Sequence, residues 1–381
     1  MYIKSLTLKN FRNYTDETFE FTNGLNLLVG ANAQGKTNVA EAVFLLCTGY
    51  SPKTAKHKIF IRCGQDYAEL FAEGYSEYGK ITLSSCFNQN GDREIKVNGA
   101  KISKMADIFG NINSVFFNPA ELKLVQESPE DRRRFMNIPL SQLSKKYFTA
   151  LIRYNKILEQ RNNLLKNPDK SIVLDTLPVW DLQLAGEASK IYYERNAFIE
   201  KIAPIAKKAC ENLSNGKETL LVELESTIKG DLDEIKNACY DNLIRNTEKD
   251  LKLGYTTFGP HRQDIKLTLN GTDVKNYGSQ GQQRTTALAL KLAEAEIFKI
   301  ETGEYPVLIL DDVFSELDRE RQKLLVKYIT GMQAIITATH VERGALTGLE
   351  VNKITIADGK IKRLRTKKST NGMMKLDQKG K

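Results

Sequence analysis

The first zone of the chain, roughly residues 1 to 118, alternates hydrophobic and polar positions. The alternating segments are YIKSLTLKNF, LNLLVG, YAELFAEGY and KITLSSCFNQNGDREIKVNG. A period of two places successive side chains on opposite faces of a sheet, and the polar and glycine residues within the last segment favour a hairpin turn. One apolar-periodic helix follows the second segment. The pattern therefore predicts a mixed sheet around one central helix.

The second zone, roughly residues 119 to 250, has helical periodicity and few turn signals. One apolar seam comprises Leu143, Tyr147, Leu151, Tyr154, Leu158 and Leu165. A second apolar face begins near Asp181, after KNPDKS and TLPVW, and comprises Leu184, Ala188, Ile191, Phe198, Ile202 and Ile205. Heptad-like spacing keeps one face of a helix against a partner. We therefore expect an antiparallel helical arm, although an ordinary helical core would show the same spacing.

The third zone, roughly residues 251 to 365, returns to strands alternating with helices. It ends in KITIADGKIKRL, in which Asp-Gly is a favoured dipeptide for a two-residue hairpin turn. Residues 366 to 381 form a basic tail that we expect to be flexible. The predicted architecture is an α/β domain split between residues 1–118 and 251–365, with the helical arm inserted between its halves.

A glycine-rich loop follows the apolar strand Leu25 to Val29 and leads directly into the periodic helix. Its residues fit the pattern G-x-x-x-x-G-K-T and are Gly30, Ala31, Asn32, Ala33, Gln34, Gly35, Lys36 and Thr37. Strand, loop and helix in this order are the context that a P-loop requires. The backbone N–H groups of such a loop point at phosphate oxygens, its lysine reaches the β- and γ-phosphates, and its threonine hydroxyl is a ligand of Mg²⁺. We therefore predict that this loop binds a nucleotide with Mg²⁺.

Two aspartates, Asp311 and Asp312, follow the continuous apolar run Val307 to Leu310. Such a run is typical of a central parallel strand that is covered on both faces. At the end of this strand Asp311 is placed to hold Mg²⁺ through water, and Asp312 to orient or polarise an attacking water. Paired aspartates can also cap a helix, but the P-loop upstream favours the first role. The next segment, Ser315 to Asp318, is expected to begin a helix.

Composition describes a globular protein, because 41% of the 381 residues are hydrophobic and 27% are charged. The sequence has no run of about 18 apolar residues, and its first residues alternate like a strand, with no apolar signal core. We therefore expect a cytoplasmic protein with no membrane partner. The five cysteines are spaced too widely for a zinc site or a compact disulfide framework, so we expect them to be small buried hydrophobic residues.

The net charge of +9 is concentrated near the C-terminal end. Residues 360 to 381 contain nine Lys or Arg and one Asp, a net charge of +8, so the rest of the chain carries only +1. A flexible basic tail can bind a nucleic-acid backbone by counterion release, or it can simply be solvated. Net charge alone therefore does not predict DNA binding.

Four motifs occur in the order that is found in ABC-type ATPases. The P-loop resembles Walker A, YGSQGQQRT (277–285) resembles the signature loop, LILDDVFSELD resembles Walker B with the D-loop, and TATHVE resembles the switch-histidine segment. Within that class the chain resembles the RecF family of bacterial recombination and repair proteins, which are relatives of SMC proteins with a short arm. This likeness rests on LTLKNFRNY, FFNPAELKLVQESPEDRRRFMN, FGPHRQD and the double aspartate, and it spans about residues 1 to 360.

The resemblance implies an ATP-dependent DNA-binding homodimer of recombinational repair, replication restart and the SOS response. Such a protein acts at gapped, single-stranded or double-stranded DNA, hydrolyses ATP slowly under stimulation by DNA, and helps to load a recombinase together with RecR-like and RecO-like mediator proteins. ATP would be the nucleotide, with Mg²⁺. In such dimers the signature loop of one subunit closes over the γ-phosphate held by the P-loop of the other.

The resemblance also assigns roles to single residues. The signature residues acting in trans would be Ser279, Gln280, Gly281 and Gln282, at the N-terminus of a helix that starts near Gln282. The D-loop residues would be Ser315 and Asp318, and Arg12 would join the ATP-binding set. Lys36, Asp311 and Asp312 would be catalytic, and so would His340 as a sensor of the γ-phosphate, unless His340 is a strand-end histidine without a special role.

Some positions depart from the wider ABC-type pattern. Asp312 stands where these ATPases usually have glutamate, and its shorter side chain fits slow hydrolysis and a switch more than a motor. No Q-loop glutamine is evident between Asn118 and Glu121. Lys53 stands where the family more often has arginine, so Lys53 and Arg12 are candidates for phosphate or base contacts.

Candidate DNA contacts lie at the start of the arm and comprise Arg132, Arg133, Arg134, Lys145 and Lys146. These residues could follow phosphates without reading bases, or they could form a solvated or internally paired helix face. His261 and Arg262 could likewise face DNA or brace the arm. No pattern such as RNP1 predicts an aromatic platform for stacked bases, so we expect sequence-nonspecific backbone binding.

Two other functions share part of this pattern. The nucleotide-binding subunit of a membrane transporter would have a compact helical insertion, a fuller Leu-Ser-Gly-Gly-Gln signature and a transmembrane partner. The long arm, FGPHRQD and the basic tail argue against it. An SMC-like ATPase of phage defence or signalling would carry or recruit a nuclease, and the few residues after Arg365 are expected to hold no appended metal-carboxylate domain.

Overall fold

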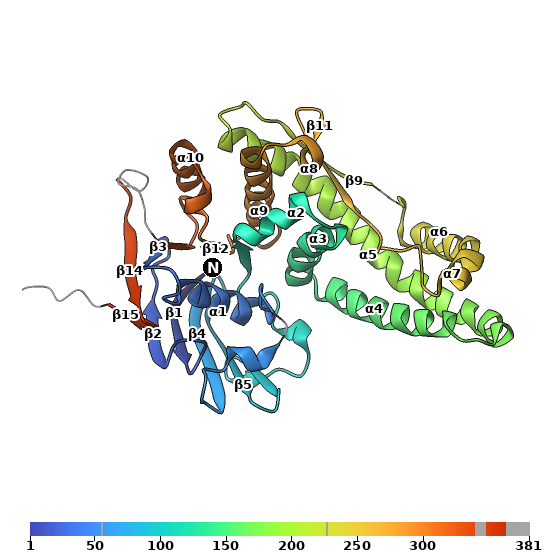
Figure 1. Cartoon of the computed structure of the whole chain (residues 1–381), viewed down its shortest axis with the longest axis horizontal. Coiled ribbons are helices and arrows are strands. Elements are labelled where there is room, and N and C mark those ends of the chain that lie inside the picture. Colours follow the sequence, from blue (N-terminus) through green and yellow to red (C-terminus); the bar gives the residue numbers. More distant parts are fainter. Residues whose placement is uncertain (55, 226–227, 340–347, 363–381) are drawn as a thin grey trace, which may run out of the picture.

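The computed structural model describes residues 1–54, 56–225, 228–339 and 348–362. Within these ranges the chain forms two six-stranded sheets, one three-stranded sheet and a long helical arm (Figure 1). None of the helices in this part of the chain combines the length and apolarity that a bilayer crossing requires.

The first six-stranded sheet is antiparallel and is built from the N-terminal zone. Its strands in spatial order are β2 (Asp16–Glu20), β1 (Tyr2–Lys9), β4 (Tyr67–Ser76), β5 (Gly79–Asn88), β6 (Arg93–Val97) and β7 (Ala100–Lys101). Leu6 pairs with Ala72 and Leu8 with Leu70 across β1 and β4, and all four side chains are buried. The alternating pattern therefore predicted β1, β4 and the β5–β6 hairpin correctly, whereas the short strands β2 and β7 were not predicted.

The second six-stranded sheet is mostly parallel and draws on both ends of the chain. Its strands in spatial order are β15 (Lys360–Ile361), β14 (Val351–Ala357), β3 (Leu25–Val29), β13 (Ala334–Ala338), β12 (Val307–Asp311) and β8 (Ser114–Phe117). Every residue of β12 and β13 is buried, as a parallel strand covered on both faces requires. The β14–β15 hairpin turns at Asp358 and Gly359, whose φ angles of 52° and 67° confirm the predicted Asp-Gly turn.

Helix α1 (Lys36–Thr48) packs between the two six-stranded sheets. Its apolar residues share one core with residues of both sheets, for example Val43 with Leu70 of β4 and Ile335 of β13. A central helix between sheets was the arrangement predicted for this domain. Because α1 is buried on most sides, its first turn, which follows the glycine-rich loop, is held in a fixed position.

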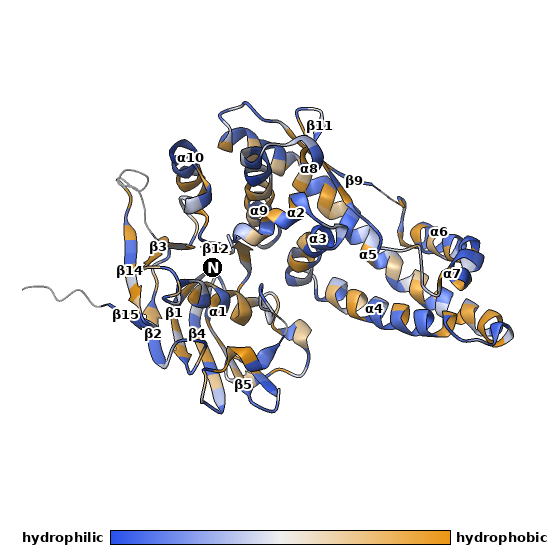
Figure 2. Ribbon diagram, in the orientation of Figure 1, coloured by the Kyte–Doolittle hydropathy of each residue, from blue (hydrophilic) through white to orange (hydrophobic). Residues whose placement is uncertain are grey.

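The arm consists of two antiparallel helices that extend away from the sheets (Figure 1). They are α4 (Lys145–Leu165) and α5 (Lys170–Leu213), and shorter helices at their base and along their side are α2 (Lys123–Gln126), α3 (Pro129–Leu143), α6 (Leu232–Arg245) and α7 (Thr247–Leu253). Apolar and polar residues alternate along both long helices (Figure 2). Tyr147, Tyr154 and Leu165 of the predicted seam are each 1% exposed and Leu151 and Leu158 are partly buried, so these residues form the inner face of α4. Leu143, the first residue of the seam, ends α3 instead.

The second arm helix begins earlier than predicted. We expected it to start near Asp181, after a break at TLPVW, but α5 begins at Lys170 with Asp169 as its N-cap and continues through Pro178. Proline removes one backbone hydrogen bond from a helix. An apolar cluster at the turn between α4 and α5 stabilises the helix on the N-terminal side of this proline. That cluster comprises Leu165, Val173 and Leu177.

A three-stranded sheet joins the second and third zones. Its strands in spatial order are β11 (Thr272–Asp273), β10 (Ile265–Leu269) and β9 (Leu220–Leu224). Strand β9 was not predicted, because it lies in the helical zone, and it pairs antiparallel with β10. Backbone hydrogen bonds thus cross the predicted limit at residue 250, and the division into domains stays a prediction.

The helices of the third zone are α8 (Val274–Tyr277), α9 (Gln280–Thr302) and α10 (Arg319–Ile329), with a 3₁₀ turn η4 (Phe314–Glu316) before α10. Helix α9 packs along α5 at the base of the arm (Figure 1). Three cysteines are buried as expected, Cys47, Cys210 and Cys239, whereas Cys63 is exposed and Cys86 is partly exposed. The expectation that all five are buried was therefore wrong.

Candidate functional site

The predicted P-loop is the turn between β3 and α1, and it lines a cavity of about 260 Å³. The opposite wall comes from distant parts of the chain, namely Lys53, Asp312 at the end of β12 and Thr337 in β13. The P-loop residues on its wall are Asn32, Ala33, Gln34, Gly35, Lys36 and Thr37. The fold therefore brings the glycine-rich loop and the double aspartate to one site, as the sequence predicted.

Two glycines of the loop are required by their surroundings. A Cβ atom on Gly30 would collide with the carbonyl oxygen of Ile356 in β14. Gly35 has a φ of 111°, and a Cβ atom there would lie 2.6 Å from the amide nitrogen of Asn13. That amide nitrogen also donates a hydrogen bond to the carbonyl of Gln34 at 3.0 Å. The loop is thus braced by neighbouring segments in the shape that it needs to surround phosphate.

Lys36 begins α1 and its ammonium group folds back over the loop. The Nζ atom donates to the carbonyl oxygens of Gly30 and Ala31, at 2.7 Å in both cases. Burial lowers the pKa of Lys36, while the nearby carboxylates of Asp312 and Asp311 oppose this shift. The ammonium is therefore held at the anion-binding end of the loop by neutral carbonyls, which a phosphate can replace.

Asp311 is the last residue of β12 and is only 4% exposed. The hydroxyl of Thr337 donates to its Oδ1 atom at 2.7 Å. Burial raises the pKa of Asp311, and hydrogen bonds from Thr337 and Thr37 oppose this shift. A divalent cation would favour the ionised carboxylate in the same way.

The oxygen donors in this corner fit Mg²⁺. This ion is usually held by one or two carboxylates together with substrate phosphates and water. Asp311 and Thr37 supply one carboxylate and one hydroxyl beside the P-loop. The described part of the chain contains no group of three or more His, Cys, Asp or Glu residues that could hold a metal, so a metal here would depend on the phosphates as well.

Asp312 adopts a backbone conformation that is rare for residues other than glycine. Its φ is 57°, which costs on the order of 1–3 kcal/mol and is found mainly at functional sites. The Asp312 N–H group donates to the carbonyl oxygen of Thr337 at 3.2 Å and to its Oγ1 atom at 3.0 Å. Ser315 of the predicted D-loop donates its hydroxyl to the Asp312 carbonyl at 2.7 Å. These bonds hold the turn that directs Asp312 into the cavity.

Thr337 was missed by sequence reasoning. It contacts both aspartates, although it belongs to a strand that is otherwise apolar. A hydroxyl residue within a buried parallel strand was the signal that could have identified it. Asp318, the other D-loop residue, is the N-cap of α10 and accepts the Arg321 N–H at 2.9 Å.

The signature loop ends in a capping box at the start of α9. The Ser279 hydroxyl accepts the Gln282 N–H at 3.3 Å, and the Gln282 side chain accepts the Ser279 N–H at 2.9 Å. The helix thus begins at Gln280, two residues earlier than predicted. Ser279 is exposed, and Gly281 has no neighbour closer than 3.5 Å to a Cβ position. Among the described residues, the signature loop does not line the P-loop cavity of its own chain.

Arg12 lies beside the site and does not line the cavity. Its guanidinium donates to both carboxylate oxygens of the buried Glu41 on α1, at 3.1 and 2.9 Å, and lies 5.2 Å from the centre of the Phe60 ring. The Ser51 hydroxyl donates to the same carboxylate at 2.5 Å. Glu41 was missed by sequence reasoning, and it joins Arg12 and the segment leading to Lys53. A role of Arg12 in ATP binding stays a prediction.

Two predicted features fall on residues outside the described ranges. They are His340 and the basic tail, residues 366 to 381. A sensor role for His340 and a DNA tether in the tail therefore stay predictions.

The first two arginines of the candidate DNA cluster are engaged within the protein. Arg132 is 5% exposed, donates to both oxygens of Asp264 at 2.6 and 2.8 Å, and also donates to two backbone carbonyls. Arg133 donates to the carbonyl of Gln263 at 3.2 Å, and burial lowers its pKa. Arg132 has no exposed surface for a phosphate, so we do not retain it as a DNA contact.

The other members of the cluster are exposed. Arg134 makes one long hydrogen bond of 3.4 Å to the carbonyl of Pro52. Lys145 lies 3.7 Å from the carboxylate of Asp107, and Lys146 is exposed next to it. These three cations remain available to a polyanion.

His261 braces the arm. The Tyr154 hydroxyl donates to Nδ1 at 2.5 Å, and the Nε2–H group donates to the carbonyl of Thr256 at 3.0 Å. Burial lowers the pKa of His261 to about 4, so the ring is neutral at neutral pH. Of the two roles considered for His261, the contacts support the structural one. Arg262 lies over the Tyr255 ring, 5.1 Å from its centre, and is exposed.

The protein should therefore lose stability as the pH falls from about 6.5 towards 4. In this window the unfolded chain protonates His261 and the folded chain does not, so acid favours unfolding by up to about 1.4 kcal/mol per pH unit. The difference in unfolding free energy between the wild type and His261→Gln, measured by chemical denaturation, should shrink across the window. Arg245→Gln, which removes an exposed side chain that does not titrate between pH 4 and 6.5, is the control. A constant difference would contradict the assignment of a neutral buried ring.

A buried network around Arg195 ties α5 to the FGPHRQD segment. Arg195 is 2% exposed and donates to Tyr147, Asn137, Gln263 and the carbonyl of Pro260, at 2.8 to 3.1 Å. This residue was not predicted from the sequence, because most arginines in a helix are exposed to solvent and nothing in the local sequence marks Arg195 as buried. The network gives FGPHRQD a structural role at the base of the arm.

A second link connects the segment after β8 with the signature helix. Gln126 donates its amide to the side chain of Gln283 at 2.8 Å. Lys291 of α9 lies 3.5 Å from the carboxylate of Glu121 and 3.0 Å from that of Glu294. A movement of α9 would therefore be transmitted to the segment Asn118 to Glu121, the position at which a Q-loop was expected.

The comparisons with known proteins agree with this geometry. A family model described as the RecF/RecN/SMC N terminal domain matches residues 2–362. The chain is 42% identical over 356 residues to the DNA replication and repair protein RecF of Lachnoclostridium phytofermentans, which covers 93% of this chain and 97% of that protein. It is 41% identical over 339 residues to the corresponding RecF of Clostridium novyi, covering 89% and 93%.

Solved structures extend the comparison to the fold. The recombination mediator protein RecF with ATP, of the RecFOR pathway, has a TM-score of 0.85 and 35% identity, over 95% of this chain and 97% of that one. An Smc head bound to the C-winged helix domain of ScpA has a TM-score of 0.57 at 17% identity, over 95% and 96%, and shares the fold. These likenesses confirm the predicted mixed α/β ATPase fold with a long helical insertion. The chain therefore belongs to the RecF family of DNA replication and repair proteins.

Proposed function

We propose that the chain is an ATP-dependent DNA-binding protein of recombinational repair and replication restart, and that it works as a homodimer with two ATP molecules at its interface. One observation carries the proposal. The P-loop and Asp312 line one cavity, with Asp311 hydrogen-bonded to Thr37 at its edge, whereas the exposed N-terminus of α9 with Ser279 lies outside it. Each monomer would thus present one half of a composite site. A solved relative has been described with ATP, which supports ATP as the nucleotide.

Each residue of the cavity would have a distinct task. Lys36 would exchange the carbonyls of Gly30 and Ala31 for the β- and γ-phosphates. Thr37 and Asp311 would hold Mg²⁺, which when bound neutralises charge that develops on the phosphates. Asp312 would orient the attacking water, and its short side chain fits a slow, DNA-stimulated ATPase that acts as a switch.

The signature loop would complete the site from the partner subunit. The N-terminus of α9 carries the positive end of the helix dipole and free N–H groups, which together favour an anion. A two-fold axis would bring Ser279 and Gly281 of each chain to the P-loop of the other, in an isologous interface. Dimerisation would then depend on ATP, because the γ-phosphate is the group that both halves contact.

DNA and mediator proteins would be the partners of the dimer. Arg134, Lys145, Lys146 and the basic tail would contact the backbone of gapped, single-stranded or double-stranded DNA without reading its sequence. The relatives are named for DNA replication and repair, and the solved ones for the RecFOR pathway, which supports RecR-like and RecO-like partners and help in loading a recombinase.

Mixing two inactive variants should restore ATP hydrolysis. Lys36→Ala removes the P-loop cation, and Ser279→Arg places a bulky cation in the signature loop. In a heterodimer one composite site contains both changes and the other contains neither, so up to about half of the wild-type rate per dimer should return if the sites are independent. DNA-stimulated hydrolysis is measured for each variant alone and for the mixture.

Crosslinking or light scattering should report heterodimers in the same samples. If heterodimers form with ATP in the intact site and hydrolysis stays at the level of either variant, independent sites in trans are excluded. If the wild-type chain never forms an ATP-dependent dimer, the composite site itself is wrong.

A further inference from the structure

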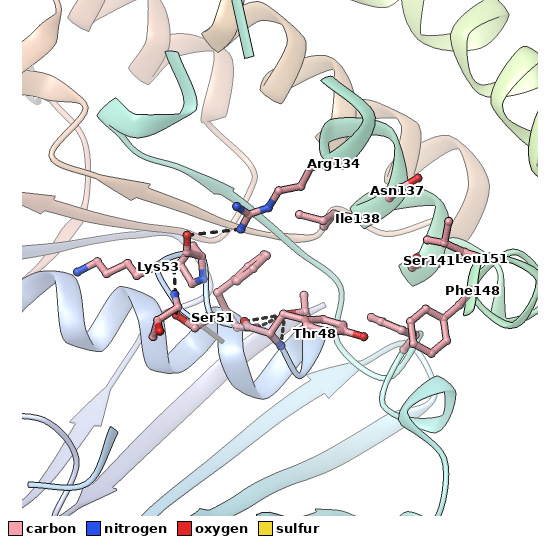
Figure 3. Close-up of a pocket in the computed structure, with 14 residues that line it drawn as sticks. Thr48, Ser51, Lys53, Arg134, Asn137, Ile138, Ser141, Phe148 and Leu151 are labelled. Carbon is pink, nitrogen blue, oxygen red and sulfur yellow. Dashed lines mark hydrogen bonds between the residues drawn. The ribbon is translucent and has the colours of Figure 1, made fainter. Parts of the chain in front are cut away.

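A second cavity, of about 430 Å³, lies between the nucleotide-binding domain and the base of the arm (Figure 3). One wall is formed by the end of α1 and the segment Ser51 to Thr54, and the other by α3 and α4. Lys53 lines both this cavity and the P-loop cavity. A molecule bound here would therefore touch the arm and the edge of the ATP site at once.

Four aromatic side chains are among the residues that line this cavity. Phe109 and Phe148 meet edge to face with their ring centres 4.9 Å apart. Phe44, Phe109 and Phe148 are 2%, 3% and 5% exposed, so Tyr50, which is 48% exposed, is the ring most open for stacking. These rings come from four separate segments, so no sequence pattern could have predicted them as a platform. The volume is within the range of roughly 300–1,000 Å³ that is typical of small-ligand sites.

The charged residues of the cavity have one sign. Of the described residues that line it, Lys53 and Arg134 are cationic and none is acidic. Figure 3 shows Arg134 extending from α3 towards the opposite wall, with Lys53 and Phe148 on opposite sides of the cavity. Within the described part of the chain, Arg134 makes one hydrogen bond, the 3.4 Å contact with the carbonyl of Pro52. The guanidinium can exchange this long bond for one to an anion.

Two more cations lie near the cavity, at the base of the arm. Phe148 lies in the first turn of α4, which begins with the exposed Lys145 and Lys146. An aromatic pocket beside a row of cations is the combination that binds single-stranded nucleic acid, in which bases stack on rings and phosphates meet the cations. A peptide partner would have no comparable need for a row of cations beside an aromatic pocket.

We infer that this cavity binds one unstacked nucleobase of a DNA strand, with its flanking phosphates on Arg134, Lys53 and the start of α4. The inference rests on the proposed function and deepens it. A base within an intact duplex is paired and stacked, whereas a base in a single-stranded gap can enter a pocket at little cost. The cavity would thus distinguish gapped from continuous DNA without reading sequence. Because Lys53 lines both cavities, a base bound in this one would lie close to the ATP site.

Binding to a gapped duplex is compared with binding to the same duplex whose gap contains only abasic nucleotides. Both substrates carry the same phosphates. The full chain with ATP should bind the base-containing gap roughly 10-fold more tightly by fluorescence anisotropy. Ser141→Leu narrows the cavity and should reduce this difference, whereas Ser141→Ala leaves the cavity open and should preserve it. Ser141 lines the cavity from α3.

A second pair of variants does not depend on the core of the protein. Arg134→Gln at the exposed rim should weaken binding of the base-containing gap more than binding of the abasic gap, and Arg245→Gln, which is exposed at the end of α6, should leave the ratio of the two affinities unchanged. Thermal unfolding of each variant shows whether it is folded. Equal wild-type affinity for both gaps would overturn the inference and leave the proposed function intact.

Other outcomes separate the inference from its alternatives. If the chain with ATP binds no DNA at all, the proposed function fails. If thymidine monophosphate binds with the same sensitivity to Ser141→Leu while the two gaps are not distinguished, the cavity belongs to a free nucleotide and the inference is wrong.

Discussion

Lys36→Ala should abolish ATP-dependent dimerisation and lower ATP hydrolysis by at least about 100-fold, which is the usual loss when a group that stabilises transition-state charge is removed. The Nζ atom of Lys36 lies 2.7 Å from two loop carbonyls, where phosphate oxygens are expected. Without this cation the γ-phosphate loses its main counter-charge, so ATP binds less tightly in the P-loop. The signature loop of the partner subunit then has no held γ-phosphate to contact, and the dimer does not form. ATP binding, light scattering and DNA retention are measured in parallel.

Asp312→Asn is the variant to compare with Lys36→Ala. It removes the charge of a side chain on the opposite wall of the same cavity and keeps its size. It should leave ATP binding and dimerisation intact, slow hydrolysis to a similar degree, and trap the ATP-bound dimer on DNA. The two variants thus separate binding from hydrolysis. Hydrolysis by Asp312→Asn at the wild-type rate would show that Asp312 does not orient the attacking water.

Arg161→Met should lower the free energy of unfolding by about 3–5 kcal/mol at neutral pH. Arg161 is fully buried in the arm and donates to Asp181 at 2.6 Å and to Asp250 at 2.7 Å. Removing it leaves two buried carboxylates without a counter-charge. Burial already raises the pKa of Asp181 while Arg161 opposes that shift, so the variant should recover part of its stability in acid, where the carboxylates are protonated.

Arg153→Met on the same helix is the control for this loss. Its side chain is 65% exposed and lies 3.9 Å from Glu187, and exposed pairs of this kind contribute about 0–1 kcal/mol. Denaturant unfolding of both variants at neutral and acidic pH gives the comparison. A loss below about 1 kcal/mol for Arg161→Met would show that the buried charge network contributes little to the stability of the arm.

The parts of the fold that are determined by residues close together in the sequence could be predicted. The strand, loop and helix around Lys36 follow one another directly in the sequence. Asp311 and Asp312 likewise directly follow their apolar strand residues. The hairpin at Asp358 requires only a local turn. In each case the pattern of a short segment determines its structure, and the parallel sheet then brings the segments together because their strands end at the same edge.

Pairings between distant residues could not be predicted. In the sequence, Arg132 and Arg134 are equivalent members of a run of three arginines. In the structure Arg132 forms a buried ion pair with Asp264, which lies in another zone of the chain, whereas Arg134 remains exposed. Thr337 and Glu41 were missed for the same reason, since their partners lie in other segments. We expected the second arm helix to start near Asp181, after TLPVW, but packing of the cluster around Leu177 keeps α5 helical from Lys170 through Pro178.

The position of β3 in the parallel sheet has a consequence for synthesis on the ribosome. Its two neighbours, β13 and β14, come from residues beyond Gly331, and a hydrogen bond from Ile3 to Gln333 spans 330 residues. At about 5–20 residues per second, the nascent chain carries an unpaired apolar strand and P-loop for tens of seconds. The helices of the arm can form meanwhile from local contacts. A polypeptide whose translation stops before Ala334 would therefore expose β3 and be a substrate for chaperones and proteases.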